Sequence, residues 1–496
     1  MTGSTDQPQE ENAIRQAWRT LRWASTAAFM VVLDATILFV AFPSIRRSFP
    51  AVLPSDLSWI LNAYSVVYAA LLAPAGRMAD RLGRRRVFLQ GVAVFTFGSF
   101  VCLMSPNPLF VIVGRVIQAV GGAMITPSSL AIILSAFPRP KWPLAVSLWA
   151  AVSALAAAVG PSLGAAIIQF GGWRWAFLIN IPIGLVVWTR SRFIVAESQD
   201  PNSGDAPDVF GIALLIISVG LLALGIVKEP EWHARGVAWS LTGLIFLAWF
   251  ISRSLRMPVP ALDLSLFEAR NFRYANIATI VFGAGFSAMF LGGVLFLSNV
   301  WGYDTAHAGL GMTPGPVTVI FAAPVAGRLA ARIGHRALLI LGGVIFGAGF
   351  LLRSIVTSGT PHYLSQWLPV VITSGIGGGL LVPSLASAAV HGLPSHRLGV
   401  GSAVNQAIRQ IGFVLGVAVT IAVVGSARGP EALNAFGLMF LLLAISGFLT
   451  AALCLPIETQ KAPSPSGQTG LQAAAERLDD ATLTGVPHKM QMKGLL

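Results

Sequence analysis

Fourteen runs of predominantly apolar residues follow one another along the chain. A helix needs about 20 apolar residues to cross the hydrocarbon core of a bilayer, and these runs have that length. Strands are not expected, because the runs are too long and lack alternation of apolar and polar residues. Helices satisfy their own backbone hydrogen bonds in lipid, so the pattern predicts an all-α polytopic membrane protein. The runs span 21–43, 57–77, 86–104, 108–136, 143–170, 175–194, 208–228, 236–255, 272–298, 308–331, 337–356, 364–390, 400–425 and 434–456.

The scarcity of charge excludes a soluble protein with a single anchor. Charged residues make up 11% of the 496 residues and apolar residues 55%, whereas a soluble domain is roughly 25% charged. The net charge of +13 comes from short basic clusters between the runs. Such clusters are typical of topology signals and not of nucleic-acid binding. Cys102 and Cys454 lie inside runs, and their spacing fits neither a disulfide framework nor a metal site.

The distribution of Lys and Arg predicts the orientation in the membrane. The N-terminus, the even-numbered loops and the C-terminal tail carry 24 of the 33 Lys and Arg residues, and the opposite loops carry seven. Cytoplasmic loops are enriched in these residues, so both termini are expected in the cytoplasm. An even number of membrane-spanning helices also requires both termini to lie on the same side of the membrane.

Two segments recur in the second half of the chain. GRMADRLGRRR at 76–86 returns as GRLAARIGHR at 327–336, and GGAMITPSSL at 121–130 returns as GGGLLVPSLA at 377–386. The order predicts two parallel six-helix repeats with two inserted central helices, an architecture that places a substrate site at the repeat interface. The expected division is a cytoplasmic N-terminal segment (1–20), an N-terminal six-helix half (21–194), a linker with two inserted helices (195–255), a cytoplasmic linker (256–271), a C-terminal six-helix half (272–456) and a disordered cytoplasmic tail (457–496).

Enzyme signatures are missing from the sequence. No lysine follows a glycine, so there is no phosphate-binding loop for ATP. The seven histidines lack zinc-site spacing. The sequence therefore predicts neither an enzyme nor a metal site, and any transport is expected to draw on an ion gradient.

Asp34 is the one carboxylate deep inside an apolar run. A charge there costs roughly 2.5–3.5 kcal/mol on insertion scales. Desolvation favours the neutral acid, so Asp34 is expected to be protonated in one state and paired with a cation or water in another. Those are the requirements for a proton-coupling group. A permanently protonated acid that only joins two helices stays open as an alternative.

Arg115 and Gln118 lie on one helix face inside the run 108–136. A guanidinium cannot lose its charge, so Arg115 must face a cavity or a partner, and it would favour ionisation of a nearby carboxylate. We expect both residues in the proton path. The alternative is a static hydrogen-bonding role.

The run 143–170 contains Gly160, Pro161 and Gly164. The two glycines allow close approach of another helix, and the proline removes a backbone hydrogen bond. Tight packing is expected, and a conformational pivot at this bend is a further hypothesis.

The basic segment 76–86 holds a single carboxylate, Asp80. Its position between Gly76 and Gly83, among five arginines, predicts a compact turn with a charge pair across helix ends. Ala331 occupies the matching position of the second copy, so the pair is expected in the first copy alone.

Polar residues also interrupt the run 400–425. Arg409 is the third charge inside a run, no carboxylate of the second half lies at similar depth, and Asn405 lies one turn before it. Both are expected to be polar residues of a cavity. The aromatic residues near run ends are expected at the membrane interface; these are Trp59, Tyr64, Trp173 and Trp175.

Several segments together resemble the fourteen-helix drug:proton antiporters of the major facilitator superfamily, the EmrB/QacA type. In the first half these are LDATILFVAFP (33–43), the segment 59–88, GRVIQAVGGAM, GPSLGA and WRWAFLINIPIG (173–184). The second half agrees through LDLSLFEARNFR (262–273), HAGLGMTPGP (307–316) and GSAVNQAIRQIGFVLGVAV (401–419). The likeness extends from about residue 20 to 456.

The resemblance implies roles for individual residues. It makes Asp34 the helix-1 coupling acid and matches Arg115, with Gln118, to the family's helix-4 motif. It places Gly76, Asp80, Gly83 and Arg84 in the cytoplasmic gate loop, and Gly160, Pro161 and Gly164 in the helix-5 antiporter motif. The departures are Ala119, Ser147, Ala156 and Ala165, where the family has glycines. The extra acids that some members use for dicationic drugs have no counterpart.

The implied function is a proton-coupled antiporter that exports amphipathic drugs or toxic compounds by alternating access. It would lie in the bacterial inner membrane and need no cofactor besides the proton gradient. Its expected partners are an amphipathic small molecule, protons and the lipid bilayer, and not nucleic acid. A periplasmic adaptor as a further partner is left open. Two alternative functions are also left open: a dedicated exporter of one metabolite, siderophore or lipid-like molecule, and a non-transporting membrane sensor or partner of a periplasmic adaptor.

Overall fold

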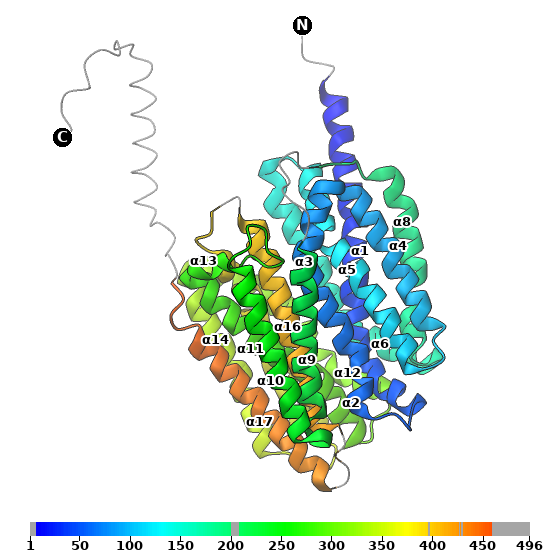
Figure 1. The fold of residues 1–496 in the computed structure, drawn as a ribbon, viewed down its shortest axis with the longest axis vertical. Helices are drawn as coiled ribbons and strands as arrows, with labels where there is room; N and C mark the ends of the chain where they lie inside the picture. Colours follow the sequence, from blue (N-terminus) through cyan, green and yellow to red (C-terminus); the bar gives the residue numbers. More distant parts are fainter. Residues whose placement is uncertain (1–5, 200–207, 395–396, 426, 428–429, 459–496) are drawn as a thin grey trace, which may run out of the picture.

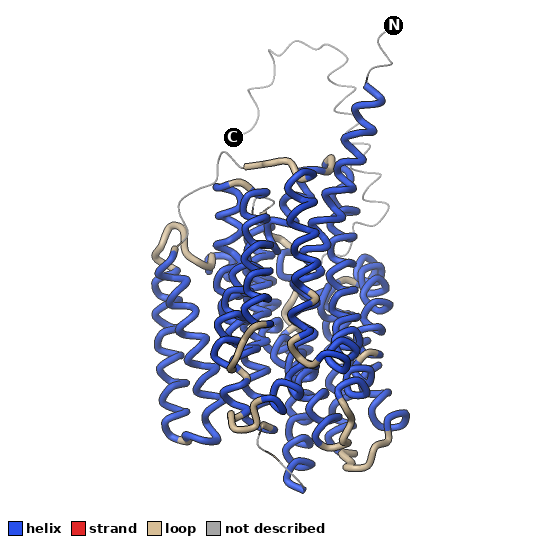
Figure 2. The backbone as a smooth tube through the Cα atoms, turned by 90° about the vertical axis from the view of Figure 1, so that its right-hand side faces the viewer, coloured by secondary structure: helices blue, strands red, loops and turns tan. Residues whose placement is uncertain are grey.

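The computed structural model describes residues 6–199, 208–394, 397–425, 427 and 430–458. Regular structure in these ranges is entirely helical (Figure 2). Fourteen helical segments are long and apolar enough to cross a membrane, so the predicted all-α polytopic fold is confirmed. Residues 459–496, most of the expected tail, lie outside the described ranges.

The helices of the first half are α1 (Asp6–Ser48), α2 (Pro54–Leu57), α3 (Trp59–Leu82), α4 (Arg84–Leu103), α5 (Pro108–Ala136), α6 (Trp142–Gly171), α7 (Trp175–Leu178) and α8 (Asn180–Ile194). The next two are α9 (Val209–Trp232) and α10 (Ala234–Ser254). The second half holds α11 (Arg270–Asn299), α12 (Thr305–Met312), α13 (Pro314–Ile333), α14 (His335–Ile355), α15 (Leu368–Val390), α16 (Leu398–Val424) and α17 (Pro430–Leu453). Short 3₁₀ or π turns lie at Arg139–Lys141, Leu264–Glu268 and Tyr363–Trp367.

Local sequence explains where the helices begin and end. The Asn107 side chain accepts a hydrogen bond from the Phe110 N–H at 3.1 Å, and Pro108 follows as the first residue of α5. Proline suits that position because its missing N–H would have no helical partner. Gly83 and Gly334 end α3 and α13 at φ of 109° and 84°, values that favour glycine. These two glycines belong to the repeated basic segments, so the repeat also repeats its turn.

The two halves use the same packing scheme. In the first half α1 packs on α5, α6 and α8, α5 on α3 and α4, and α4 on α8. In the second half α11 packs on α15, α16 and α17, α15 on α13 and α14, and α14 on α17. Each contact of one half has its counterpart in the other. The predicted six-helix repeat is therefore present in three dimensions, with α9 and α10 between its copies in sequence.

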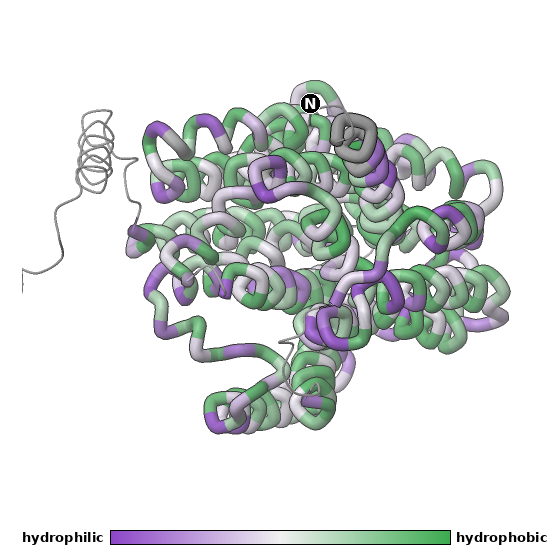
Figure 3. The backbone as a smooth tube through the Cα atoms, turned by 90° about the horizontal axis from the view of Figure 1, so that it is seen from above, coloured by the Kyte–Doolittle hydropathy of each residue, from purple (hydrophilic) through white to green (hydrophobic). Residues whose placement is uncertain are grey.

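The inserted helices lie on one side of the bundle. They form a hairpin that projects from the other helices (Figures 1 and 3). Between the halves, α3 packs on α16 along one junction, and α6 packs on α12 and α13 along the other. Helix α9 contacts both α3 and α16. The insert thus covers the first junction and leaves the second one uncovered.

The two ends of the helix bundle are distinguished by the direction of α1. The terminal end is where α1 begins, and the far end is where it ends at Ser48 (Figure 1). The halves are in close contact at the far end. A Cβ atom on Gly309 of α12 would collide with Ala165 and with the carbonyl oxygen of Pro161, both in α6. There Arg47 also donates a hydrogen bond to the Thr305 hydroxyl at 2.9 Å, and the Phe39 and Phe290 rings stack at 5.9 Å.

The terminal end is more open. Apart from Ala145, no described residue from 144 to 155 in α6 is buried, whereas none from 156 to 165 is exposed. One face of α16 shows the same gradient. Ser402 is exposed and Gln406 is partly exposed, but Val417 and Ile421 further along are buried. The halves therefore separate toward the terminal end and close at the far end.

Candidate functional site

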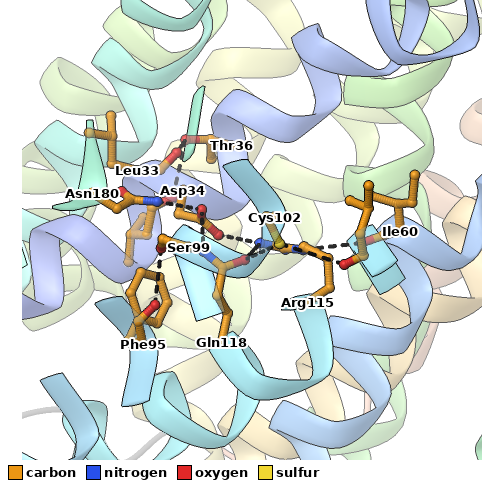
Figure 4. Close-up of polar contacts among 12 residues, drawn as sticks. Leu33, Asp34, Thr36, Ile60, Phe95, Ser99, Cys102, Arg115, Gln118 and Asn180 are labelled. Atoms are coloured by element: carbon orange, nitrogen blue, oxygen red, sulfur yellow. Dashed lines mark hydrogen bonds and ion pairs between the residues drawn. The ribbon is translucent and has the colours of Figure 1, made fainter. Parts of the chain in front are cut away.

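Asp34 lies fully buried in α1 and is the centre of a polar cluster (Figure 4). One carboxylate oxygen, Oδ2, pairs with the Arg115 guanidinium of α5. The other, Oδ1, accepts hydrogen bonds from the amides of Gln118 at 3.0 Å and Asn180 at 2.7 Å. The carboxylate is thus held by three donors from α5 and α8. A buried charge needs such partners, because an unpaired charge inside the bundle is costly.

Arg115 has partners on every side. Its Nε donates to the Ile60 carbonyl oxygen at 3.1 Å, and its Nη1 donates to the Gln118 side chain at 2.8 Å. The guanidinium also lies 4.0 Å from the centre of the Tyr64 ring. Gln118 in turn donates to the Ser99 hydroxyl of α4 at 2.7 Å. The cluster therefore ties together α1, α3, α4, α5 and α8, so a change of charge on Asp34 reaches five helices.

Three members of this cluster were not predicted. Asn180 and Ser99 are both fully buried, and an amide or hydroxyl inside an apolar run is the only signal that the sequence offers for them. Tyr64 was expected at the membrane interface, and that prediction is wrong. It is 3% exposed and stacks on Tyr68 at 5.6 Å, because its position on α3 turns the ring toward Arg115. Trp173, 2% exposed, is likewise buried, and its indole N–H donates to Ser48 at 3.0 Å.

The glycines of α6 bring that helix against α1 close to Asp34. A Cβ on Gly160 would collide with the Thr36 side chain, and one on Gly164 would lie 3.0 Å from Ile37. Pro161 faces the second half instead, since its carbonyl oxygen is next to Gly309. The predicted close approach is confirmed. The motif joins the Asp34 segment of α1 to the junction between the halves.

The predicted charge pair in the turn between α3 and α4 is present. Arg84 contacts Asp80 at 2.8 Å, and Gly83 stands between them with its φ of 109°. A Cβ on Gly83 would lie 2.8 Å from the Glu197 carboxylate. Gly76 lies further back along α3, where a Cβ would be 3.4 Å from Pro127 of α5.

Glu197, in the polar segment after α8, was not predicted as part of this turn. Its carboxylate accepts hydrogen bonds from the backbone N–H groups of Arg85 and Arg86 at 3.0 and 3.2 Å. A carboxylate at the start of a helix satisfies free N–H groups and complements the helix dipole. The turn is therefore fixed by one acid on each side, Asp80 and Glu197.

Asn405 and Arg409 lie in α16, on the opposite side of the junction from Tyr68. Asn405 is buried and donates to Asn276 at 2.9 Å and to Thr279 at 3.2 Å, both in α11. It is therefore a contact between α16 and α11, and not a residue of an open cavity as expected. Arg409 is only half-buried, and its Nη2 donates to Gln406 at 2.5 Å.

Comparison with known proteins agrees with this architecture. The family model described as Major Facilitator Superfamily matches residues 24–295 and 275–482. The chain is 32% identical to the multidrug resistance protein Stp of Mycobacterium tuberculosis, over 81% of this chain and 74% of that protein. It is also 32% identical to the cephamycin export protein CmcT of Amycolatopsis lactamdurans, over 81% of this chain and 84% of that protein.

The fold has solved counterparts. A bacterial homologue of the human drug peptide transporters PepT1 and PepT2 aligns with a TM-score of 0.62 at 15% identity. The alignment covers 89% of this chain and 98% of that one. Because the family match includes both halves and the fold agrees, the chain belongs to the Major Facilitator Superfamily, a family of transporters and not of enzymes.

Proposed function

We propose that the protein is a proton-coupled exporter of amphipathic small molecules. The observation that carries the proposal is the Asp34–Arg115 pair, buried inside the bundle of a major facilitator transporter. Export is supported by relatives whose names describe it, among them the cephamycin exporter and the tetracenomycin C resistance and export protein of Streptomyces glaucescens, 29% identical. In this proposal the other cluster residues hold Asp34 ready to exchange a proton.

Protonation would change the cluster in a defined way. A neutral Asp34 loses its ion pair with Arg115, which still has Ile60, Gln118 and the Tyr64 ring as partners. Loss of this ion pair weakens the contact between α1 and α5. Since α1 packs against α6 at Gly160 and Gly164 and also contacts α11, its movement reaches both halves. Each proton that moves inward supplies about 2.3 kcal/mol per 100 mV of membrane potential.

The orientation is part of the same proposal. The predominance of Lys and Arg on the side of the termini supports a cytoplasmic location of the terminal end. The structure would then be an inward-facing state, with the periplasmic side closed by Gly309, Arg47 and Phe39. We place the protein in the bacterial inner membrane. The moving units are the six-helix halves 21–194 and 272–456, joined by 195–255 and 256–271.

Substrate-induced collapse of a pH gradient in proteoliposomes tests the coupling. Wild type should dissipate the gradient when an exported compound is added, and Asp34→Asn should reduce this to background, because the amide cannot take up a proton. Asp304→Asn is the control, since Asp304 is an exposed acid at the start of α12. Equal collapse by wild type and Asp34→Asn would show that the proton is carried elsewhere.

A further inference from the structure

Helix α16, at its junction with α3, carries a positive charge without an acidic partner among the described residues. Arg409 lies on the partly exposed face of α16 formed by Ser402, Gln406, Arg409 and Phe413. Among the residues that the structure describes, no Asp or Glu forms an ion pair with Arg409. Its Nη2 hydrogen bonds to the neutral Gln406 amide, and its Nε is buried without a partner. The guanidinium therefore keeps unused donors.

The buried acid of the first half already has its partners. Asp34 is fully buried, and its carboxylate already accepts hydrogen bonds from Arg115, Gln118 and Asn180. This ion pair is neutral overall, so it leaves the charge of Arg409 uncompensated. An uncompensated cation in a low-dielectric setting attracts an anion strongly and repels a second cation. The Arg409 guanidinium is thus suited to binding an anionic ligand.

The surroundings of Arg409 suit an amphipathic molecule. The Tyr68 hydroxyl of α3 bonds to Thr126 at 2.8 Å and also interacts with Gln406. One turn beyond Arg409, the partly exposed Phe413 stacks on Phe286 at 5.9 Å. Polar donors and aromatic faces therefore adjoin the guanidinium. This combination can hold an acidic oxygen at one point and a flat apolar body beside it.

We propose that Arg409 binds the acidic group of the substrate, and that the exported compounds are amphipathic anions such as carboxylates, enolates or phenolates. The inference rests on the proposed export function and names its substrate class. A lipophilic cation would be repelled by this guanidinium, whereas an anion would be attracted to it. Gln406 accepts a hydrogen bond from Arg409 and so helps to orient it.

Uptake into inside-out proteoliposomes tests the charge preference. The anionic probes are fluorescein and 1-anilinonaphthalene-8-sulfonate, and the cationic probes are rhodamine 123, which shares the xanthene framework of fluorescein, and ethidium. Wild type should accumulate the anions and not the cations. Arg409→Gln should raise KM for fluorescein by roughly tenfold to a hundredfold, the value of a lost charged hydrogen bond, with a smaller effect on kcat.

Two further variants separate charge from folding. Arg409→Lys keeps the charge and should restore much of the fluorescein uptake, whereas Arg409→Glu should abolish it and admit rhodamine 123. Proton-coupled transport of the cations by wild type, unchanged in Arg409→Gln and without transport of the anions, would overturn the substrate class but leave the exporter intact. The absence of both uptake and pH collapse with all four probes in wild type would instead overturn the exporter itself.

Discussion

Asp208, just before α9, is an acid whose ionisation stabilises the fold. Burial opposes its charge, but hydrogen bonds from Arg253 at 2.5 Å and from the Gly211 N–H at 2.9 Å outweigh this and hold the pKa of Asp208 below its usual value. A lowered pKa means that the stabilisation is fully present above the unfolded-state pKa of about 4 and is lost as the pH falls through the folded-state pKa. Asp208 therefore stabilises the inserted pair at neutral pH.

We expect Asp208→Asn to destabilise the protein by about 1 kcal/mol at pH 7. The difference from wild type should shrink as the pH falls below about 4, where the wild-type acid also becomes neutral. Thermal unfolding in detergent at several pH values measures this. Arg253→Met should cost a similar amount, and the double variant should cost less than the sum of the two. A penalty that is constant with pH would contradict the assignment.

The sequence could single out Asp34, Arg115 and Gln118, because charged and amide groups stand out in an apolar run. It could not show that they meet. Asn180 carries the same kind of signal, yet 146 positions separate it from Asp34, and only packing of α8 on α1 brings them together. The misplacement of Tyr64 has a similar origin. An aromatic residue near a run end is usually interfacial, and which way its ring points depends on the facing helix.

At the scale of helices, α6 depends on the small size of Gly160. A methyl group there would collide with Thr36, which is β-branched and has no flexible end to move aside. We expect Gly160→Ala to destabilise the protein by about 1–3 kcal/mol through overpacking. Transport should fall as well, because the collision lies two residues from Asp34. Thermal unfolding and substrate uptake together measure both effects.

Gly220→Ala is the matched control for this substitution. Gly220 lies inside α9, and a Cβ there would meet no atom within 4 Å. Alanine is a better helix former than glycine, so this variant should be neutral or more stable by up to about 1 kcal/mol. Thr36→Ala in the Gly160→Ala background should restore part of the lost stability. Equal behaviour of Gly160→Ala and Gly220→Ala would show that the α1–α6 contact tolerates a side chain.

Helix positions were predictable because the membrane requires about 20 apolar residues per crossing. The repeat of the basic segments then ordered the helices into two halves. The short helices at the far end, among them α2 and α12, were not predicted. They are too short to give an apolar run of their own, and α2 is the mostly polar segment Pro54–Leu57. Their contacts matter nonetheless. Lys228 of α9 pairs with Asp56 of α2 at 2.9 Å and so ties the insert to the first half.

For the whole molecule, alternating access requires the far end to open. Ala165 and Gly309 are in contact there, and a disulfide needs Cβ atoms about 3.8 Å apart. We expect Ala165→Cys with Gly309→Cys, in a background with Cys102→Ala and Cys454→Ala, to crosslink on oxidation once α6 and α12 have moved apart enough to relieve the collision at Gly309. Oxidation should stop substrate uptake nearly completely, and reduction should restore it. Full activity of the oxidised protein would contradict transport by separation at this end.

The position of α9 makes the two sides of the molecule unequal toward the bilayer. On the side of α3 and α16 a third helix lies over the junction, so lipid meets the inserted pair there. On the side of α6 and α13 no inserted helix lies over the junction, and Phe321 of α13 is among the exposed apolar residues there. We therefore expect changes in acyl-chain length or lateral pressure to reach the junction of α6 and α13 directly, and the junction of α3 and α16 only through the inserted pair. Turnover would then respond to the bilayer from one side of the molecule.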